Sequence, residues 1–324
     1  MFNKSPPLWP RDQRRILKAL RQHHAPLRIM LKTRNDPYFL EDWHRHHAAI
    51  VGPENLVIAD NMSNDPLVCR LLAQLARVST VFRFDAFHDE LHKRDRFKDL
   101  YAVLEETCDW SILLDTDERL IWIEEGHWSA GQDLPDRLTA LAAGAPALPG
   151  LLIENHLGQR THFDFPANPD RLSRVLHWGK PAIASGHGLT VTGPQCHNIQ
   201  FPAAMFDAGV PPRLIALHLC NLLPEQRLRA NREKLAARGL CSPQTPYADI
   251  AHLDVRQETR SVIRRCVLET RRLLASASSE AIAVPPKAMV MQPDGQITFS
   301  DADIGRTFEF AQTQGAAILR AALN

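Results

Sequence analysis

The chain has 324 residues, of which 44% are hydrophobic and 23% are charged. These proportions are typical of a folded globular protein and exclude disorder as a description of the whole chain. The 38 basic and 37 acidic residues give a net charge of +1, so the chain has no bulk attraction for nucleic acid and we expect no nucleic-acid partner.

The first elements along the chain alternate between the periodicity of a helix and that of a strand. A short basic amphipathic helix is expected over residues 11–22. Short apolar strands are then predicted at 27–31, 56–59, 81–84 and 112–114. Helices are predicted between them at 38–49, from 66 onward and at 94–106. Such alternation predicts an α/β fold with a mostly parallel sheet flanked by helices.

Polar turns follow three of these strands, at residues 33–36, 60–65 and 115–118. The carboxyl ends of parallel strands lie at one edge of a sheet, and ligands bind there. We therefore expect the three turns to converge on one crevice.

Beyond residue 125 the pattern is less regular. A strand is predicted over 214–219, a helix over 224–238 and a long helix over 254–274. We predict three parts: an N-terminal basic helix, a central α/β domain and a helical C-terminal extension, over residues 1–25, 26–240 and 241–324.

The sequence Asp115-Thr116-Asp117 directly follows the fourth predicted strand. Two carboxylates at this spacing can reach one hard divalent cation such as Mg²⁺ or Mn²⁺. The pattern is short, and a second copy at 301–303 has no strand before it. Capping or solvated turn residues are therefore the alternative interpretation for Asp115 and Asp117.

Asp60 ends the second predicted strand and begins the sequence Asp-Asn-Met-Ser-Asn-Asp. This composition is typical of a turn in which the carboxylate bonds to its own backbone. The same carboxylate could accept a hydrogen bond from a nucleobase or ribose held at the edge of the sheet. The sequence leaves both roles open.

Two stretches, 33–72 and 96–123, resemble the family-2-like glycosyltransferases, especially the glycosyltransferase family 92 type, and the resemblance covers residues 27–123. The matching residues are Asn35, Glu41, Trp43, His47, Gly52, Asp60-Asn61-x-Ser63-x-Asp65 and Asp115-Thr116-Asp117-Glu118. Thinner matches follow at Gly179-Lys180, His197, His218, Lys234 and Gly239. The chain departs from the family pattern at Arg119 and Leu219, where aromatic residues are common.

The resemblance implies a GT-A fold, a nucleotide-sugar donor, a glycan or lipid-linked acceptor, and Mn²⁺ or Mg²⁺ as cofactor. The metal ligands that it implies are Asp115, Asp117 and His218. The donor-binding residues would be Thr33, Asn35, Asp60, Asp65, Arg94, Asp115 and Lys180. Positive charge at the leaving diphosphate is the chemistry that such a site must supply.

Activation of the acceptor hydroxyl can require a general base, often a carboxylate. Glu154, Asp164 and Asp207 are available, and their spacing does not choose between them. We prefer Asp164, which lies in the sequence His-Phe-Asp-Phe. Whether the product retains or inverts the anomeric configuration is left open.

Two other functions compete with this interpretation. A nucleotidyltransferase also pairs carboxylates with nucleotide phosphates, but residues 31–37 lack the glycine-rich loop that it would normally have. A non-catalytic GT-A-like scaffold would bind nucleotides without turnover. The histidine clusters at 23–24 and 44–47 are not interpreted as zinc ligands, and His47 is interpreted as a packing or hydrogen-bonding residue.

The location is predicted from absent signals. The first 15 residues have no apolar core of a signal peptide, and the six cysteines form no CxxC pair. We expect a cytoplasmic protein without a membrane span. Basic faces at 11–21 and 254–274 allow a weak, salt-sensitive contact with the inner face of an anionic membrane. The oligomeric state is not predicted.

Overall fold

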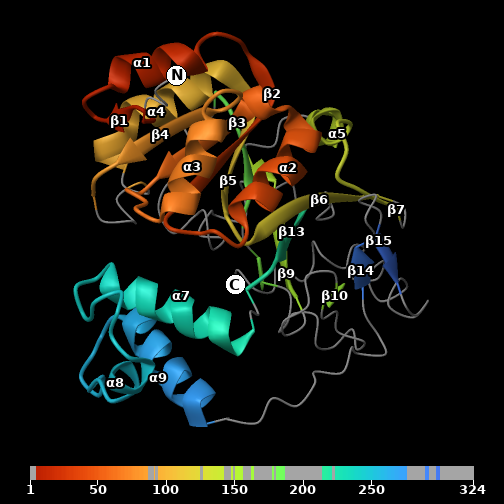
Figure 1. The fold of residues 1–324 in the computed structure, drawn as a ribbon. Helices are drawn as coiled ribbons and strands as arrows, with labels where there is room; N and C mark the ends of the chain where they lie inside the picture. The colour runs from red at the N-terminus through yellow and green to blue at the C-terminus, as the bar shows by residue number, and fades with distance from the viewer. Residues whose placement is uncertain are drawn as a thin grey trace.

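A computed structural model gives the fold (Figure 1). It describes residues 5–86, 91, 94–124, 127–141, 147–148, 150–155, 162–163, 177–178, 180–186, 214–220, 223–275, 289–291 and 297–299.

The centre of the molecule is a seven-stranded sheet in the order β1-β4-β3-β2-β5-β12-β8. The five strands from β1 to β5 are parallel to their neighbours, and β12 runs antiparallel to both β5 and β8. The prediction of a mostly parallel α/β sheet is therefore confirmed. The strands are β1 (Leu8–Trp9), β2 (Ala25–Thr33), β3 (Leu56–Asp60), β4 (Thr80–Phe84), β5 (Cys108–Asp115), β8 (Ala147–Leu148) and β12 (Ala182–Ala184).

Helices cover both faces of this sheet, which explains its nearly continuous apolar strands. Along β2, Ile29 and Leu31 belong to one hydrophobic cluster and Met30 belongs to the other, as the two-residue period of a strand requires. The first cluster takes residues from α2 (Leu40–Val51), α3 (Pro66–Leu75) and α5 (Leu134–Leu141). The second takes residues from α1 (Gln13–Leu20) and α4 (Arg94–Thr107).

The strand order reverses at β2. The chain moves outward from β2 to β3 and β4, and α4 then returns it to β5 on the other side of β2. At this reversal Lys32 of β2 is the register partner of Asp115 of β5. Ligands of open parallel sheets bind at such a switch point.

A second sheet, which the sequence analysis did not predict, begins where β5 ends. Its five strands are ordered β11-β9-β13-β6-β7, and β13 pairs antiparallel with β6. The turn at Thr116 and Asp117 joins the two sheets. The strands are β6 (Glu118–Glu124), β7 (His127–Ser129), β9 (Gly150–Glu154), β11 (His177–Trp178) and β13 (Leu214–His218). A third sheet contains β10 (His162–Phe163), β14 (Met289–Met291) and β15 (Ile297–Phe299).

Three helices form a separate layer in Figure 1: α7 (Pro224–Ala236), α8 (Tyr247–Ala251) and α9 (Ser261–Ala275). Their shared apolar cluster contains Leu235, Ile250, Val255, Ile263, Cys266 and Val267. The predicted boundary at residue 240 lies between α7 and α9, which pack against each other. The three-part division stays a prediction.

The start of the long helix predicted over 254–274 was wrong, since α9 begins only at Ser261. Asp254 accepts hydrogen bonds from the backbone and guanidinium of Arg256, and Glu258 does the same for Arg260. Such local bonds compete with helix formation. Within the described residues, no helix combines the length and the apolar character needed to cross a bilayer.

Candidate functional site

The three polar turns meet, as the sequence analysis predicted. The side-chain amide of Asn35 donates to Asn64 Oδ1 at 2.8 Å, which joins the first turn to the second. The Thr116 hydroxyl donates to Asp36 Oδ2 at 2.5 Å, which joins the third turn to the first. Hydrogen bonds therefore hold the carboxyl ends of β2, β3 and β5 together.

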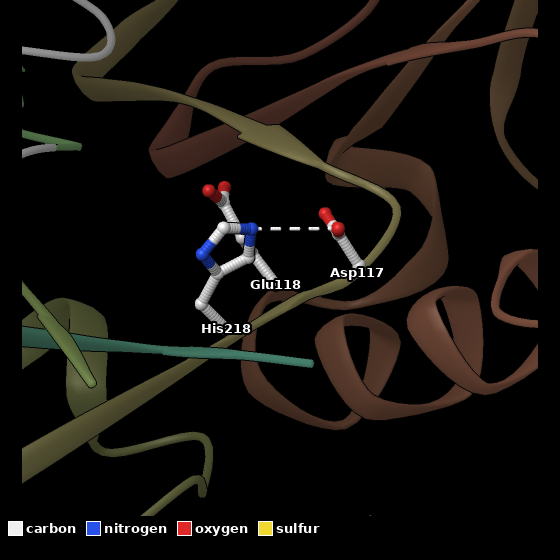
Figure 2. A group of neighbouring side chains, drawn as sticks. All are labelled: Asp117, Glu118 and His218. Atoms are coloured by element: carbon white, nitrogen blue, oxygen red, sulfur yellow. Dashed lines mark ion pairs between the residues drawn. The ribbon is translucent and has the colours of Figure 1, made fainter. Parts of the chain in front are cut away.

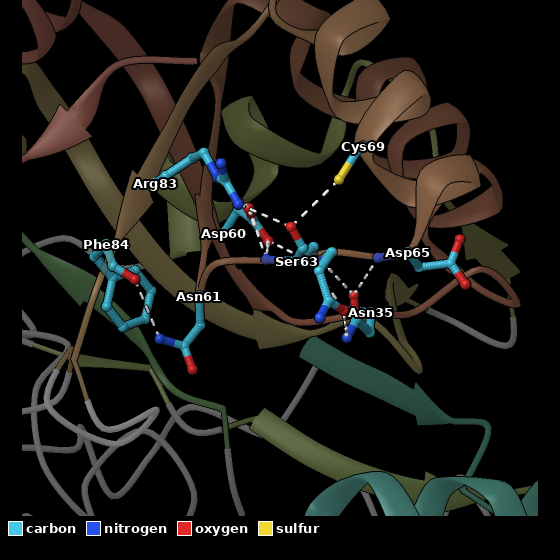
Figure 3. A network of polar contacts seen from close by, with 9 residues as sticks. Asn35, Asp60, Asn61, Ser63, Asp65, Cys69, Arg83 and Phe84 are labelled. Atoms are coloured by element: carbon cyan, nitrogen blue, oxygen red, sulfur yellow. Dashed lines mark hydrogen bonds and ion pairs between the residues drawn. The ribbon is translucent and has the colours of Figure 1, made fainter. Parts of the chain in front are cut away.

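The Asp60 carboxylate is fully buried and is bonded within its own turn and to the next strand (Figure 3). It accepts hydrogen bonds from the Ser63 amide at 3.1 Å, from the Ser63 hydroxyl at 2.5 Å and from Arg83 Nε at 3.1 Å. Burial raises the pKa of Asp60, against the opposing effect of Ser63 and Arg83. These contacts match the turn interpretation of Asp60, and its contact with a nucleoside stays a prediction.

Asn35 and Asp65 have similar local roles (Figure 3). Asn35 takes a left-handed backbone conformation with φ 47°, and its Oδ1 accepts from the amides of Asn64 and Asp65. Asp65 is the N-cap of α3, where its carboxylate accepts from the amides of Leu67 and Val68. Both predicted donor-binding residues thus shape the turns.

Asp117, Glu118 and His218 form a cluster at the end of β5 (Figure 2). Glu118 begins β6, His218 ends β13, and the two are register partners in the antiparallel pair. Each residue has a ligand atom within 4.8 Å of the other two, and no other such group of three occurs in the described part of the chain. Two carboxylates and an imidazole are a ligand set that suits Mn²⁺ and, with the oxygens dominant, Mg²⁺.

An ion pair joins two members of this cluster. His218 Nε2 lies 3.4 Å from Asp117 Oδ2 (Figure 2). Burial alone would lower the pKa of His218, but the Asp117 carboxylate more than offsets it and holds that pKa well above its usual range. Burial alone would likewise raise the pKa of Asp117, which His218 instead brings below its usual range. The pair is therefore charged at neutral pH.

Two further observations fit a cation at this cluster. His218 Nδ1 is buried and makes no hydrogen bond of normal geometry to a described residue, although the Cys220 thiol is near enough to raise the pKa of the ring. Burial, with Lys180 opposing it, raises the pKa of Glu118 to about 7. Among the described residues, the hydrogen-bonding capacity of His218 Nδ1 and the negative charge of Glu118 are therefore each satisfied only in part.

Asp115 lies beside the cluster and is engaged by a lysine. Lys180 Nζ is 2.8 Å from Asp115 Oδ2 and 3.0 Å from Glu118 Oε2, and the lysine side chain is only 2% exposed. The structure thus brings Asp115, Asp117, Lys180 and His218 together as the resemblance implied. It groups Glu118, and not Asp115, with Asp117 and His218 as possible metal ligands. The only sequence signal for Glu118 was its place in the Asp-Thr-Asp-Glu match.

The remaining predicted residues lie as follows. Thr33 ends β2 opposite Asp60, and its buried hydroxyl has no hydrogen-bond partner among the described residues. Arg94 begins α4, and its side chain lies outside the described part of the structure. Asp164, the preferred general base, also lies outside the described residues.

Arg119, which departs from the family pattern, bonds to the backbone of the acidic turn. Its buried guanidinium donates to the carbonyls of Thr116, Glu118 and Phe39 at 2.8, 2.9 and 3.2 Å. The arginine therefore ties the acidic turn to the start of α2, a role that the sequence analysis did not predict.

His47 is a hydrogen-bonding core residue, as predicted. Its Nδ1 donates to the Trp43 carbonyl at 2.8 Å, and its Nε2 accepts from the Leu120 amide at 3.1 Å. Both ring nitrogens are used, and the ring links α2 to the start of β6.

No protein-family model matches the chain, and no curated protein matches it. Among solved structures, it is similar to the mannosyltransferase PcManGT from Pyrobaculum calidifontis in complex with GDP-Man and Mn²⁺, with 12% identity over 95% of this chain and 91% of that chain and a TM-score of 0.37. It is also similar to S. aureus TarS 1–349, with 10% identity over 78% of this chain and 72% of that chain and a TM-score of 0.33. Scores this low carry no argument about function, and the fold assignment rests on the strand order itself.

Proposed function

We propose that the chain is a metal-dependent glycosyltransferase of the GT-A, family-92-like type. It would transfer a sugar from a nucleotide-sugar donor to a glycan or lipid-linked acceptor. The observation that supports this most directly is the Asp117–Glu118–His218 cluster, placed where β5 ends beside the switch point of the parallel sheet. The sequence resemblance supplies the reaction class.

Asp117, Glu118 and His218 would hold the Mn²⁺ or Mg²⁺ ion. A bound divalent cation supplies positive charge to the departing nucleoside diphosphate. Arg119 and the Thr116–Asp36 hydrogen bond would keep the acidic turn in place during that step, because they join it to α2 and to the turn after β2. Preorganised groups of this kind need no rearrangement as charge develops.

The nucleoside would bind across the turns after β2 and β3. The unpartnered hydroxyl of Thr33 and the carboxylate of Asp60 are the polar groups proposed to contact it. Asn35 and Asp65 would act by fixing the two turns, since their side chains bond to backbone amides. Arg94 as a diphosphate contact and Asp164 as the base rest on the sequence alone.

A panel of nucleoside diphosphates and nucleotide sugars tests the proposal. We expect one nucleoside diphosphate to raise the melting temperature by several degrees in Mn²⁺ and not in EDTA, and its sugar conjugate to be hydrolysed slowly or transferred. Stabilisation without any turnover would identify a non-catalytic nucleotide-binding protein. The absence of both effects with every nucleotide would contradict the proposed function.

We further propose a cytoplasmic protein that makes weak contact with anionic membrane. On α1, Arg14, Arg15 and Lys18 are exposed. On α9, Arg264 and Arg265 are exposed beside Leu268. Each basic residue contributes about 1 kcal/mol near an anionic surface, and salt screens the attraction. We expect co-sedimentation with anionic vesicles at low salt that disappears at high salt, and no binding at low salt would refute the contact.

A further inference from the structure

Lys180 is a buried cation that contacts carboxylates of the acidic turn. Its Nζ reaches two carboxylates, Asp115 at 2.8 Å and Glu118 at 3.0 Å. Its backbone takes a left-handed conformation, with φ 52°, two residues before β12 begins. A lysine side chain that is 2% exposed is costly to bury and persists only where its charge is paired.

The carboxylates of the site pair with different cationic side chains among the described residues. Asp117 pairs with His218, whereas Asp115 and Glu118 share Lys180. The Asp115 amide also donates to Glu118 Oε2 at 2.8 Å, so that oxygen already has two partners. The Asp115 carboxylate and Glu118 Oε2 are therefore already bonded within the protein.

We propose that Lys180 is a positioning residue that holds Asp115 and one oxygen of Glu118 away from the metal site and weakens the affinity of that site for a free divalent cation. This inference rests on the proposed metal-binding function of Asp117, Glu118 and His218.

The physical reason is electrostatic. An ammonium group within 3.0 Å of a metal-ligating carboxylate neutralises part of its charge and repels the incoming cation. Burial makes both effects stronger, because solvent and salt screen buried charges poorly. Divalent ions at phosphate-transfer sites commonly bind through one or two carboxylates together with the phosphates of the substrate. A site weakened by Lys180 would hold its ion well only when a diphosphate is also present, so the ion would arrive with the donor and leave with the product.

Lys180→Gln tests this role, because it removes the charge and keeps hydrogen-bond donors for the two carboxylates. The matched control is Lys98→Gln, which removes a charge from an exposed position on α4. Mn²⁺ affinity is measured without nucleotide, by the electron paramagnetic resonance of free Mn²⁺ and by the Mn²⁺-induced change in melting temperature. At pH 8.5, well above the pKa of about 7 that Glu118 has in the wild type, we expect Lys180→Gln to bind Mn²⁺ about tenfold tighter than the wild type, to melt lower without metal and to gain more from Mn²⁺. The control should match the wild type.

Unchanged or weaker Mn²⁺ binding by Lys180→Gln, with binding by the wild type intact, would overturn the role of Lys180 alone. The absence of Mn²⁺ binding in the wild type and in both variants would overturn the metal site, and the proposed function with it. If Lys180→Gln does not fold, Lys180→Arg decides, because it keeps the charge. Affinity within about threefold of the wild type supports a charge effect, and a tenfold change in affinity overturns it.

Discussion

Two acidic turns, one after β3 and one after β5, lie at the same edge of the parallel sheet, and their carboxylates have different partners (Figures 2 and 3). Asp60 is bonded to Ser63 in its own turn and to Arg83 in the adjacent strand. Asp117 is paired with His218, which comes from a strand of the second sheet. An acidic turn that is bonded locally stabilises the fold, whereas the turn that meets a distant histidine brings three possible ligand atoms within 4.8 Å of one another.

The largest effect is expected at the turn that contains Asp117. Asp117→Asn keeps the side-chain volume and removes the charge, so we expect transfer to fall by roughly 10³-fold, or about 4 kcal/mol in transition-state stabilisation. We expect the protein to stay folded, with a melting temperature that falls because His218 loses its ion-pair partner. Initial rates and thermal unfolding measure the two effects, with the exposed Asp136→Asn on α5 as control. Transfer near the wild-type rate would refute the metal-site assignment.

At the turn that contains Asp60, we expect the main effect of a substitution to be on the free energy of unfolding. Asp60→Ala removes the buried carboxylate that accepts from Arg83 Nε and from the Ser63 hydroxyl, so the free energy of unfolding should fall by about 3 kcal/mol in a denaturant titration. If Asp60 also contacts the nucleoside, its loss should weaken nucleoside diphosphate binding by about 1–3 kcal/mol in calorimetry. Unchanged affinity would leave Asp60 with the turn role alone.

The pH dependence of metal binding sharpens the comparison. The pKa of Glu118 is raised to about 7 by burial and the pKa of His218 lies well above its usual value beside Asp117, so a metal must displace more protons from these groups as the pH falls. Mn²⁺ affinity should therefore rise with pH, by about tenfold between pH 6.5 and 8.5. Calorimetry across this range measures it, and His218→Gln should bind Mn²⁺ more weakly and with a shallower pH dependence. An affinity that falls as the pH rises would contradict the assigned ligands.

The smallest effect is expected at Asp65, whose carboxylate caps α3. Asp65→Ala should lower the free energy of unfolding by about 1 kcal/mol through loss of the cap, while Asp65→Ser keeps an acceptor and should lose less. Neither variant should change Mn²⁺ affinity, because the residue lies outside the cluster. A change in Mn²⁺ affinity would show that the two turns are coupled more closely than their contacts indicate.

The parallel half of the fold could be predicted because its signals are local. Apolar runs such as Leu56–Ala59 lie between turn residues, and Asp65-Pro66 is a helix start that the structure reproduces. The second sheet has weaker signals: β6 follows the acidic turn directly, and its partner β13, which also pairs with β9, comes from a segment far along the chain. Strand pairing over such separations depends on the whole chain, which no local pattern records.

By itself, the sequence determined that acidic turns would end buried parallel strands, and that these turns would meet at one edge of the sheet. Only the tertiary structure decided which carboxylates are already satisfied. Asp115 and Asp117 are two positions apart and chemically identical, yet one is paired with Lys180 and the other with His218. Glu118 joins the possible metal ligands because β13 pairs with β6 in the register that sets His218 opposite it. The role of a carboxylate depends on the charges that surround it in three dimensions, and those charges come from strands that are distant in the chain.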